Sequence, residues 1–252
     1  MPLAFTRQVS PRIVDCALTH LDRTPIDPDL AAVQHGNYER ALRDAGFDLV
    51  RLPYLADDPD AVFVEDTALL LGEHAVITRP GAASRVDEAP STAEGLKPYF
   101  TVHQLAGGTL DGGDVLRIDG TLYVGQSSRS DAAGTKALAD VVGPLGFQVV
   151  PVNVGQCLHL KTAVTYAGNG TLLVNPDWVD PAIFEGTMAL EVAEDEPFGA
   201  NIVRAGDRLI YAAGSPRTAA KLNDLGFMVV EVDLSELQKA EAGGTCMSLI
   251  SD

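Results

Sequence analysis

The sequence is poor in positive charge. It has 18 lysine and arginine residues against 35 aspartate and glutamate residues, which gives a formal net charge of -17 at pH 7. Because nucleic acids and anionic membrane surfaces are bound through basic patches, this composition argues against both as partners. Acidic charge keeps proteins soluble in general, but it also favours the approach of a small cationic molecule.

Cysteine is scarce as well, with Cys16, Cys157 and Cys246 far apart in the chain. This odd, widely spaced set fits neither a disulfide framework nor a CxxC metal site. The first residues lack the charged start and apolar stretch of a signal peptide, and no apolar run is long enough to span a membrane. We therefore expect a protein of the reducing cytoplasm.

Three segments share one pattern, in which a helical stretch is followed by Gly-Phe and then by an apolar strand. They cover residues 37–52, 136–152 and 219–232. Glycine is the residue preferred just past the end of a helix, and the alternation that follows it is typical of a strand.

A hairpin pattern precedes the second and third of these segments, and looser copies of it occur elsewhere in the chain. The two clearest hairpins and two looser copies cover residues 114–125, 201–214, 66–79 and 161–175. The last stretch, 246–252, is expected to complete the series, with residues 12–18 as a possible partner strand. The unit of hairpin, helix and strand thus recurs about every 40 to 50 residues, a period typical of repeated architectures.

About five copies of this unit fill the chain, the last one shared between its two ends. A closed ring is the economical arrangement, because it removes the unpaired sheet edges of an open array. We therefore predict an α/β fold built as a fivefold propeller-like ring with helices outside, forming a single domain over residues 1–252 without a linker.

Polar residues stand at comparable places, at the entry to the first strand of each copy. They are Glu65 with Asp66, Asp111 with Asp114, His159 with Lys161, Asn201, and Cys246. In a ring these positions converge on the central axis. A thiol nucleophile, an imidazole base and an orienting acid would then share one cavity, which is a catalytic constellation.

Taken singly, each residue has an ordinary structural interpretation. Cys246 could pack as a small hydrophobic residue, His159 could be a hydrogen-bonded core histidine, and Asp111 to Asp114 could be a turn. The arginines of residues 78–85 and 126–129, two loops that follow the second strand of a copy, could form surface ion pairs, although two guanidinium groups also suit a substrate carboxylate. Polar clusters at equivalent points of every copy favour the functional interpretation.

Five motifs together resemble dimethylarginine dimethylaminohydrolase, a family of the guanidino-group-modifying superfamily with the pentein β/α-propeller fold. They are residues 60–66 (DAVFVED), 77–85 (ITRPGAASR), 109–116 (TLDGGDVL), 158–161 (LHLK) and 245–248 (TCMS). The resemblance spans almost the whole chain in the same order. It implies an active site in the central channel of the ring.

The resemblance also implies a role for each matching residue. Cys246 would be the nucleophile, His159 the general acid and base, and Asp111 the acid that completes the triad. The substrate would be bound by Glu65 and Asp66 at the guanidinium, by Asp60 and the carbonyls of Leu18 and Ala240 at the α-ammonium, by Arg85 and Arg129 at the α-carboxylate, and by Phe63 at the pocket wall. Residues 19–30 resemble the mobile lid of the family.

Three features, at four positions, depart from some relatives. Asp111 is shorter than the glutamate found in some of them, Thr162 replaces a serine, and Gly243 with Gly244 replaces leucines. Asp111 and the glycines could alter the shape of the pocket and with it the N-methyl preference, whereas none of these changes removes the triad.

The implied reaction is hydrolysis of methylated arginine to citrulline through an S-alkylthiouronium on Cys246, with no metal or organic cofactor. Zinc would inhibit by binding Cys246 and His159, because thiolate and imidazole are its preferred ligands. A guanidine hydrolase or amidinotransferase acting on arginine or another guanidino compound is the alternative. A non-catalytic pentein scaffold fits poorly, since it has no need of a thiol, histidine and acid at equivalent positions. The sequence is compatible with a homodimer as well as a monomer.

Overall fold

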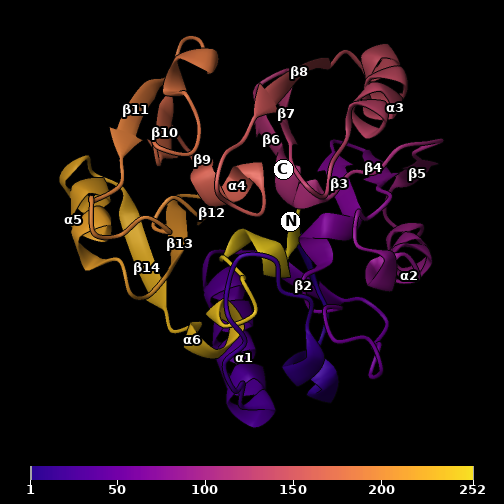
Figure 1. Ribbon diagram of the computed structural model, residues 1–252, viewed down its shortest axis with the longest axis horizontal. Helices are drawn as coiled ribbons and strands as arrows, with labels where there is room; N and C mark the ends of the chain where they lie inside the picture. The colour runs from indigo at the N-terminus through magenta and orange to yellow at the C-terminus, as the bar shows by residue number, and fades with distance from the viewer. Residues whose placement is uncertain (1, 252) are drawn as a thin grey trace.

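The computed structural model describes residues 2–251 and contains five small sheets arranged around a common axis (Figure 1). The sheets, in chain order, are β15 (Leu249–Ile250) with β1 (Leu3–Thr6) and β2 (Asp48–Arg51), β3 (Ala68–Leu71) with β4 (His74–Ile77) and β5 (Thr101–Gln104), β6 (Val115–Ile118) with β7 (Thr121–Gln126) and β8 (Gln148–Asn153), β9 (Val164–Gly168) with β10 (Thr171–Val174) and β11 (Met188–Glu191), and β12 (Ile202–Ala205) with β13 (Arg208–Ala212) and β14 (Met228–Val232). The predicted fivefold ring is confirmed.

Every sheet has the same strand pattern. The first strand pairs antiparallel with the second, and the third strand runs parallel to the second on its other side. A parallel pair cannot be joined by a tight turn, so the chain crosses over between the second and third strands. This crossover is where the predicted helices stand.

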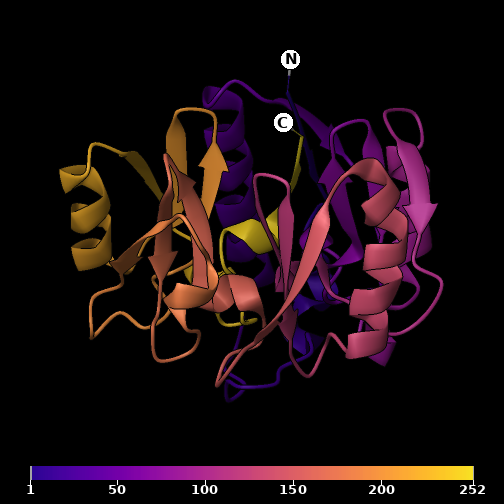
Figure 2. The same cartoon turned by 90° about the horizontal axis from the view of Figure 1, so that it is seen from above.

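Four longer helices lie on the outside of the ring, as expected, at the periphery of Figure 1, and the view in Figure 2 shows the gold helix of residues 216–224 and the rose helix of residues 132–142 on opposite sides. They are α1 (Pro28–Asp44), α2 (Glu88–Leu96), α3 (Ala132–Val142) and α5 (Pro216–Asp224), while α4 (Leu160–Ala163) and α6 (Ser235–Gln238) are single turns. The fourth sheet differs, because its crossover between β10 and β11 contains only the 3-10 turn Pro181–Ile183. No helix of residues 2–251 combines the length and apolar character that crossing a bilayer requires.

The glycines that end the predicted helices adopt the left-handed backbone. Gly46, Gly146 and Gly226 have φ of 93°, 92° and 86°. In each case the amide of the following phenylalanine returns to a carbonyl five residues earlier, as in Phe47 to Leu42, at 3.1 to 3.2 Å. This is the Schellman arrangement, which satisfies the last carbonyls of the helix and turns the chain into the next strand.

The ring is closed by the two ends of the chain. β15 pairs antiparallel with β1, with Ala4 opposite Ile250. The expected partner strand at residues 12–18 was wrong, because Pro11–Asp15 forms a 3-10 turn. Ser10 caps this turn by accepting the amide of Arg12, and a proline at the first position of the turn favours helical over extended backbone.

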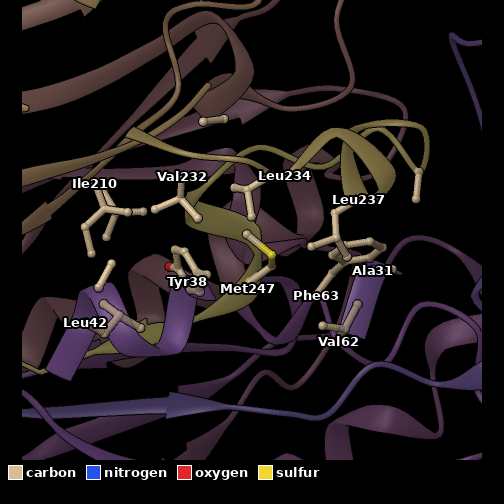
Figure 3. Packing of buried hydrophobic residues seen from close by; sticks show 14 of the residues in the cluster. Ala31, Tyr38, Leu42, Val62, Phe63, Ile210, Val232, Leu234, Leu237 and Met247 are labelled. Carbon is tan, nitrogen blue, oxygen red and sulfur yellow. The ribbon is translucent and has the colours of Figure 1, made fainter. Parts of the chain in front are cut away.

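The residue after the predicted nucleophile is anchored in the core. Met247 is fully buried and lies between Tyr38 of α1 and Leu237 of α6 in the close-up of Figure 3. The hydroxyl of Tyr38 also shares a 2.7 Å hydrogen bond with Ser248. Residues 247 and 248 therefore hold the turn that carries Cys246 against the longest helix.

We predict opposite effects for two glycine substitutions in one unit. Gly46→Ala should lower the free energy of unfolding by about 1 kcal/mol, because alanine is strained at positive φ. Gly36→Ala, inside α1 where an added Cβ meets no atom within 4 Å, should raise it by roughly 0.5 to 1 kcal/mol through helix propensity. Chemical denaturation of both variants is the measurement, and the same sign for both would contradict this account.

Candidate active site

Four short helical turns form the inner end of the ring. They are Val64–Thr67, Gly112–Asp114, α4 (Leu160–Ala163) and Thr245–Met247, and each directly precedes the first strand of a sheet. The turn at Val64–Thr67 contacts those at Gly112–Asp114 and Thr245–Met247, and α4 contacts Gly112–Asp114. Residues far apart in the sequence are thus brought together at the axis, as the repeat predicted.

Eight of the eleven predicted site residues line one small pocket. These are Asp60, Phe63, Asp66, Arg85, Arg129, His159, Ala240 and Cys246, joined by Ala17, Leu158, Glu241 and Ala242. The pocket has a volume of about 30 Å³. The three predicted residues outside its lining are Asp111, Glu65 and Leu18, and each of them has a definite place nearby.

Asp111 lies behind the histidine. Its Oδ2 is 3.0 Å from Nε2 of His159, and its Oδ1 accepts the amide of Gly81 at 2.8 Å. Asp111 is fully buried, and its own amide donates to the hydroxyl of Ser130 at 3.0 Å. A carboxylate fixed in this way orients the imidazole and stabilises its protonated form, which is the role that an acid has in a catalytic triad.

A second aspartate, Asp114, fixes the backbone around the histidine. Its Oδ1 accepts the amide of Leu160 at 2.9 Å, and its Oδ2 accepts the hydroxyls of Ser127 and Ser130 at 2.6 Å each. Asp114 therefore connects the strand entry of His159 to the loop that carries Arg129. The repeat had already placed Asp114 among the equivalent polar positions, but it had given the residue no role.

The protonation of the thiol and the imidazole follows from the surrounding charges. Burial alone would lower the pKa of His159, but Asp66, Asp111 and Asp114 together raise it to about 9. Burial and the carboxylates of Glu65 and Asp66 raise the pKa of the Cys246 thiol to about 12, opposed by the amide of Gly243 at 3.4 Å from Sγ. At neutral pH the site thus holds a neutral thiol and an imidazolium.

Two buried carboxylates face the pocket. Asp66 accepts Nη1 of Arg85 at 2.5 Å and the amide of Gly113 at 3.1 Å. Burial disfavours the ionised form of Asp66, but His159 and Arg85 hold its pKa below the usual value. Asp60 accepts the amide of Ala17 at 3.2 Å, and burial raises the pKa of its carboxyl. Such a pair of carboxylates favours a cationic ligand.

Glu65 points away from the pocket. Its Oε1 accepts Nζ of Lys161 at 2.6 Å and its Oε2 accepts the hydroxyl of Thr245 at 2.6 Å. These three residues line a separate cavity of about 220 Å³ among the inner strands β3, β6, β12 and β15. The neighbours Glu65 and Asp66 therefore serve opposite sides of the same turn, and the Glu65–Lys161 pair lies at the base of the site.

The two predicted arginines differ in how fully they are paired. Arg85 is buried, forms a bidentate pair with Glu88 at 3.0 and 2.8 Å, and also contacts Asp66 and the carbonyl of Phe63. Arg129 donates to the hydroxyl of Thr19 at 3.1 Å, and its Nη1 is 3.8 Å from Asp111. Sequence reasoning missed Glu88, although its spacing of three residues from Arg85 was a usable signal.

A loop closes the pocket. Glu241, which has a positive φ of 62°, accepts the amides of Thr19, His20 and Leu21 at 2.5 to 3.0 Å. The remaining space is closer to the size of a water molecule than to that of an amino acid. The contacts lie in the segment expected to act as a lid, whereas Leu18 packs against the core cluster next to α1. No sequence signal had indicated Glu241.

One group of residues could hold a metal ion in the part of the chain that the structure describes. Ligand atoms of Asp66, Asp111 and His159 lie within 4.8 Å of one another. Two carboxylates and an imidazole are common ligands of divalent ions. The pair expected for zinc, Cys246 with His159, shares the same pocket, and inhibition by zinc stays a prediction.

Comparisons with known proteins support the function that the sequence motifs imply. A scan against models of protein families found no match. The chain is 40% identical to an N(G),N(G)-dimethylarginine dimethylaminohydrolase of Streptomyces coelicolor, over 98% of this chain and 95% of the relative. A DDAH structure from Pseudomonas aeruginosa, a cysteine-to-serine variant complexed with citrulline, matches with a TM-score of 0.94 and 34% identity over 98% of both chains. A histidine-to-glycine variant of a dimethylarginine dimethylaminohydrolase, solved as an adduct with S-methyl-L-thiocitrulline, matches with a TM-score of 0.93 and 34% identity over the whole of both chains.

We predict that His159 stabilises the fold in a pH-dependent way. Its pKa is raised from 6.5 to about 9, so the folded state binds the proton more tightly than the unfolded chain. The stabilisation is fully present below pH 6.5 and is lost as the pH rises through 9. The unfolding free energy of the wild type relative to His159→Gln should therefore fall across this window in denaturant titrations. A difference that stays constant from pH 6 to 9.5 would contradict the assignment.

Proposed function

The chain belongs to the dimethylarginine dimethylaminohydrolase family, and we propose that Cys246, His159 and Asp111 are the residues with which it hydrolyses Nω-methylated arginines to citrulline. The observation that carries this proposal is the single pocket in which the thiol and the imidazole face the carboxylates of Asp60 and Asp66. The products are citrulline and dimethylamine or methylamine. We further propose that residues 1–252 act as one catalytic domain with the pentein fold.

The substrate is a small cation of the arginine type, and its charges define its orientation. We assign the guanidinium to Asp66, with Glu65 supporting the base of the site through Lys161 and Thr245. The α-ammonium is assigned to Asp60 and the carbonyls of Leu18 and Ala240. Burial makes an unpaired Asp60 carboxylate unfavourable, so an ammonium partner stabilises it.

The α-carboxylate is assigned to Arg129 and Arg85, with Phe63 at the pocket wall. Arg129 is the better placed, because the guanidinium of Arg85 already has Glu88, Asp66 and backbone carbonyls as partners. Arg85 then acts mainly by holding Asp66 and the pocket wall in position. Forked guanidinium groups match the geometry of a carboxylate.

The first chemical step depends on the substrate cation. The Cys246 thiol is neutral in the resting site, and a guanidinium held beside it lowers its pKa, because an adjacent cation favours the thiolate. The thiol then gives its proton to solvent water, since His159 is already protonated. The sulfur then forms a bond to the guanidinium carbon. His159, protonated at neutral pH, gives its proton to the departing amine as the carbon–nitrogen bond breaks, which leaves an S-alkylthiouronium on Cys246.

The second step returns the enzyme to its starting state. The neutral imidazole of His159 takes a proton from a water molecule, and the resulting hydroxide adds to the thiouronium carbon. Collapse of that adduct breaks the carbon–sulfur bond and forms the ureido group of citrulline, and the proton released from the hydroxyl is taken up by the departing sulfur, which restores the neutral cysteine. Asp111 stabilises the imidazolium each time it forms, through the 3.0 Å contact with Nε2.

The setting of the enzyme is inferred from its cysteines. Cys16, Cys157 and Cys246 are all free, and the first two are buried. A reactive thiol needs a reducing environment to remain usable, which supports a cytoplasmic location.

We predict that Cys246→Ser keeps the fold and lowers kcat for asymmetric dimethylarginine by at least about 1,000-fold. Cys16→Ala, which removes a thiol from the core, serves as the matched control, and its kcat should stay within the same order of magnitude as that of the wild type. Citrulline formation from dimethylarginine, monomethylarginine and arginine is the measurement. A clear preference for unmethylated arginine would favour the alternative guanidine hydrolase, and near-normal turnover in Cys246→Ser would remove the nucleophile assignment.

We also predict that the site activates its thiol only towards cations. Neutral iodoacetamide should react slowly with Cys246 at pH 7, since the thiol pKa is about 12. A cationic haloacetamidine should react at least about tenfold faster than iodoacetamide, after both rates are normalised to a free thiol in solution. Peptide mapping shows which cysteine reacts. Equal normalised rates for the two reagents would contradict activation by the bound cation.

A further inference from the structure

Asn201 occupies the fourth of the five equivalent positions of the ring, directly before β12, and the reaction described above gives it no role. Its side chain is buried and makes three hydrogen bonds with residues of the site's base. Nδ2 donates to the carbonyl of Lys161 at 2.9 Å and to the hydroxyl of Thr245 at 3.1 Å, while Oδ1 accepts the amide of Thr245 at 3.0 Å. One amide therefore holds both the turn of α4 and the turn that carries the thiol.

The donor and the acceptor of each hydrogen bond in this network can be assigned. Thr245 donates its single hydroxyl proton to Oε2 of Glu65 at 2.6 Å, so its oxygen can only accept from Asn201. Glu65 in turn accepts Lys161. The chain of contacts runs from the amide of Asn201 through Thr245 to the ion pair at the base of the site, with a donor and an acceptor matched at each step.

The same amide also packs against the backbone beside the thiol. A Cβ added to Gly243 would lie 2.4 Å from Cγ of Asn201, so only glycine allows this close approach. The amide of Gly243 in turn donates to Sγ of Cys246 at 3.4 Å. Asn201 thus determines where the donor to the sulfur lies, as well as where the preceding residue of the turn lies.

We propose that Asn201 is a positioning residue for the nucleophile, which sets the place of the Cys246 sulfur through Thr245 and Gly243 without touching the substrate. This inference rests on the proposed role of Cys246 and goes beyond it, because it assigns a function to a residue outside the reacting groups. Misplacement of a nucleophile by a fraction of its contact distance is costly, since the near-attack geometry is lost. The effect therefore falls on kcat and on the reactivity of the thiol.

The matched control is another buried asparagine. Asn175 also makes side-chain hydrogen bonds to the backbone, from Nδ2 to the carbonyl of Pro197 and from the amide of Asp177 to Oδ1, each at 3.0 Å. It lies after β10 and does not line the catalytic pocket. A purely structural role for Asn201 predicts similar results for the two alanine variants, whereas a positioning role separates them.

The experiment compares Asn201→Ala with Asn175→Ala in kcat, KM, melting temperature and the pH dependence of Cys246 alkylation. Asn201→Ala should lower kcat roughly 10- to 100-fold with KM changed by no more than a few fold, and should shift the alkylation profile to higher pH. Asn175→Ala should lose stability but keep kcat and the alkylation profile. Equal kcat and profile in the two variants would overturn the proposal.

A second pair of variants keeps the test decisive if Asn201→Ala does not fold. Thr245→Val removes the hydroxyl that links Asn201 to Glu65, and Thr245→Ser retains it. The valine variant should show the loss of kcat and the serine variant should recover most of it, while equal activity in both would refute the network. Cys246→Ser, measured alongside, separates the two proposals. Full turnover in Cys246→Ser would reject Cys246 as the nucleophile. Loss of turnover in Cys246→Ser combined with normal turnover in Asn201→Ala would reject only the positioning role of Asn201.

Discussion

The antiparallel pairing of β1 with β15 is the interaction on which the site depends. It joins the two ends of the chain over only two residue pairs, Ala4 with Ile250 and Phe5 with Leu249, and is extended by two hydrogen bonds between Leu3 and Ser251. This short contact closes the ring. It brings the turn of Cys246 beside the turn of Glu65 and Asp66, although about 180 residues separate them. The buried anchors Met247 and Ser248 keep the same turn from moving once the ring is closed.

Closure of the ring brings several buried carboxylates close together. We use their negative charge to account for both the binding of a cationic substrate and the reactivity of the thiol. Asp66, Asp111 and Asp114 keep His159 protonated, and burial with Glu65 and Asp66 keeps the thiol neutral. We therefore expect the resting thiol to react slowly with neutral electrophiles. In the proposed mechanism, a guanidinium bound beside these carboxylates supplies the positive charge that stabilises the thiolate, so substrate recognition and activation of the nucleophile would have one electrostatic cause.

Much of this could be predicted from the sequence, because the repeat has a strong local signal. The Gly-Phe steps at the helix ends and the polar residue at each strand entry indicated the ring and its axis. The partner predicted for the closing strand was wrong, because strands of two to four residues carry too little periodicity to identify a partner. The repeat alone could not show that the crossover between β10 and β11 lacks a longer helix. The sequence also gave no sign that Glu65 and Asp66 face opposite sides, or that Arg85 is already paired with Glu88, since both depend on packing between distant turns.

The most direct test of the central claim is to trap the covalent intermediate. With S-methyl-L-thiocitrulline, whose methanethiolate leaves without a proton from the imidazole, His159→Gly should still form the thiouronium but hydrolyse it slowly, because no group remains to activate the water. The intact variant, quenched after mixing with this analogue, should gain the mass of the analogue less methanethiol. Proteolysis should place that mass on the peptide that contains Cys246. A variant that turns over without any adduct, or an adduct on Cys16 or Cys157, would contradict the account.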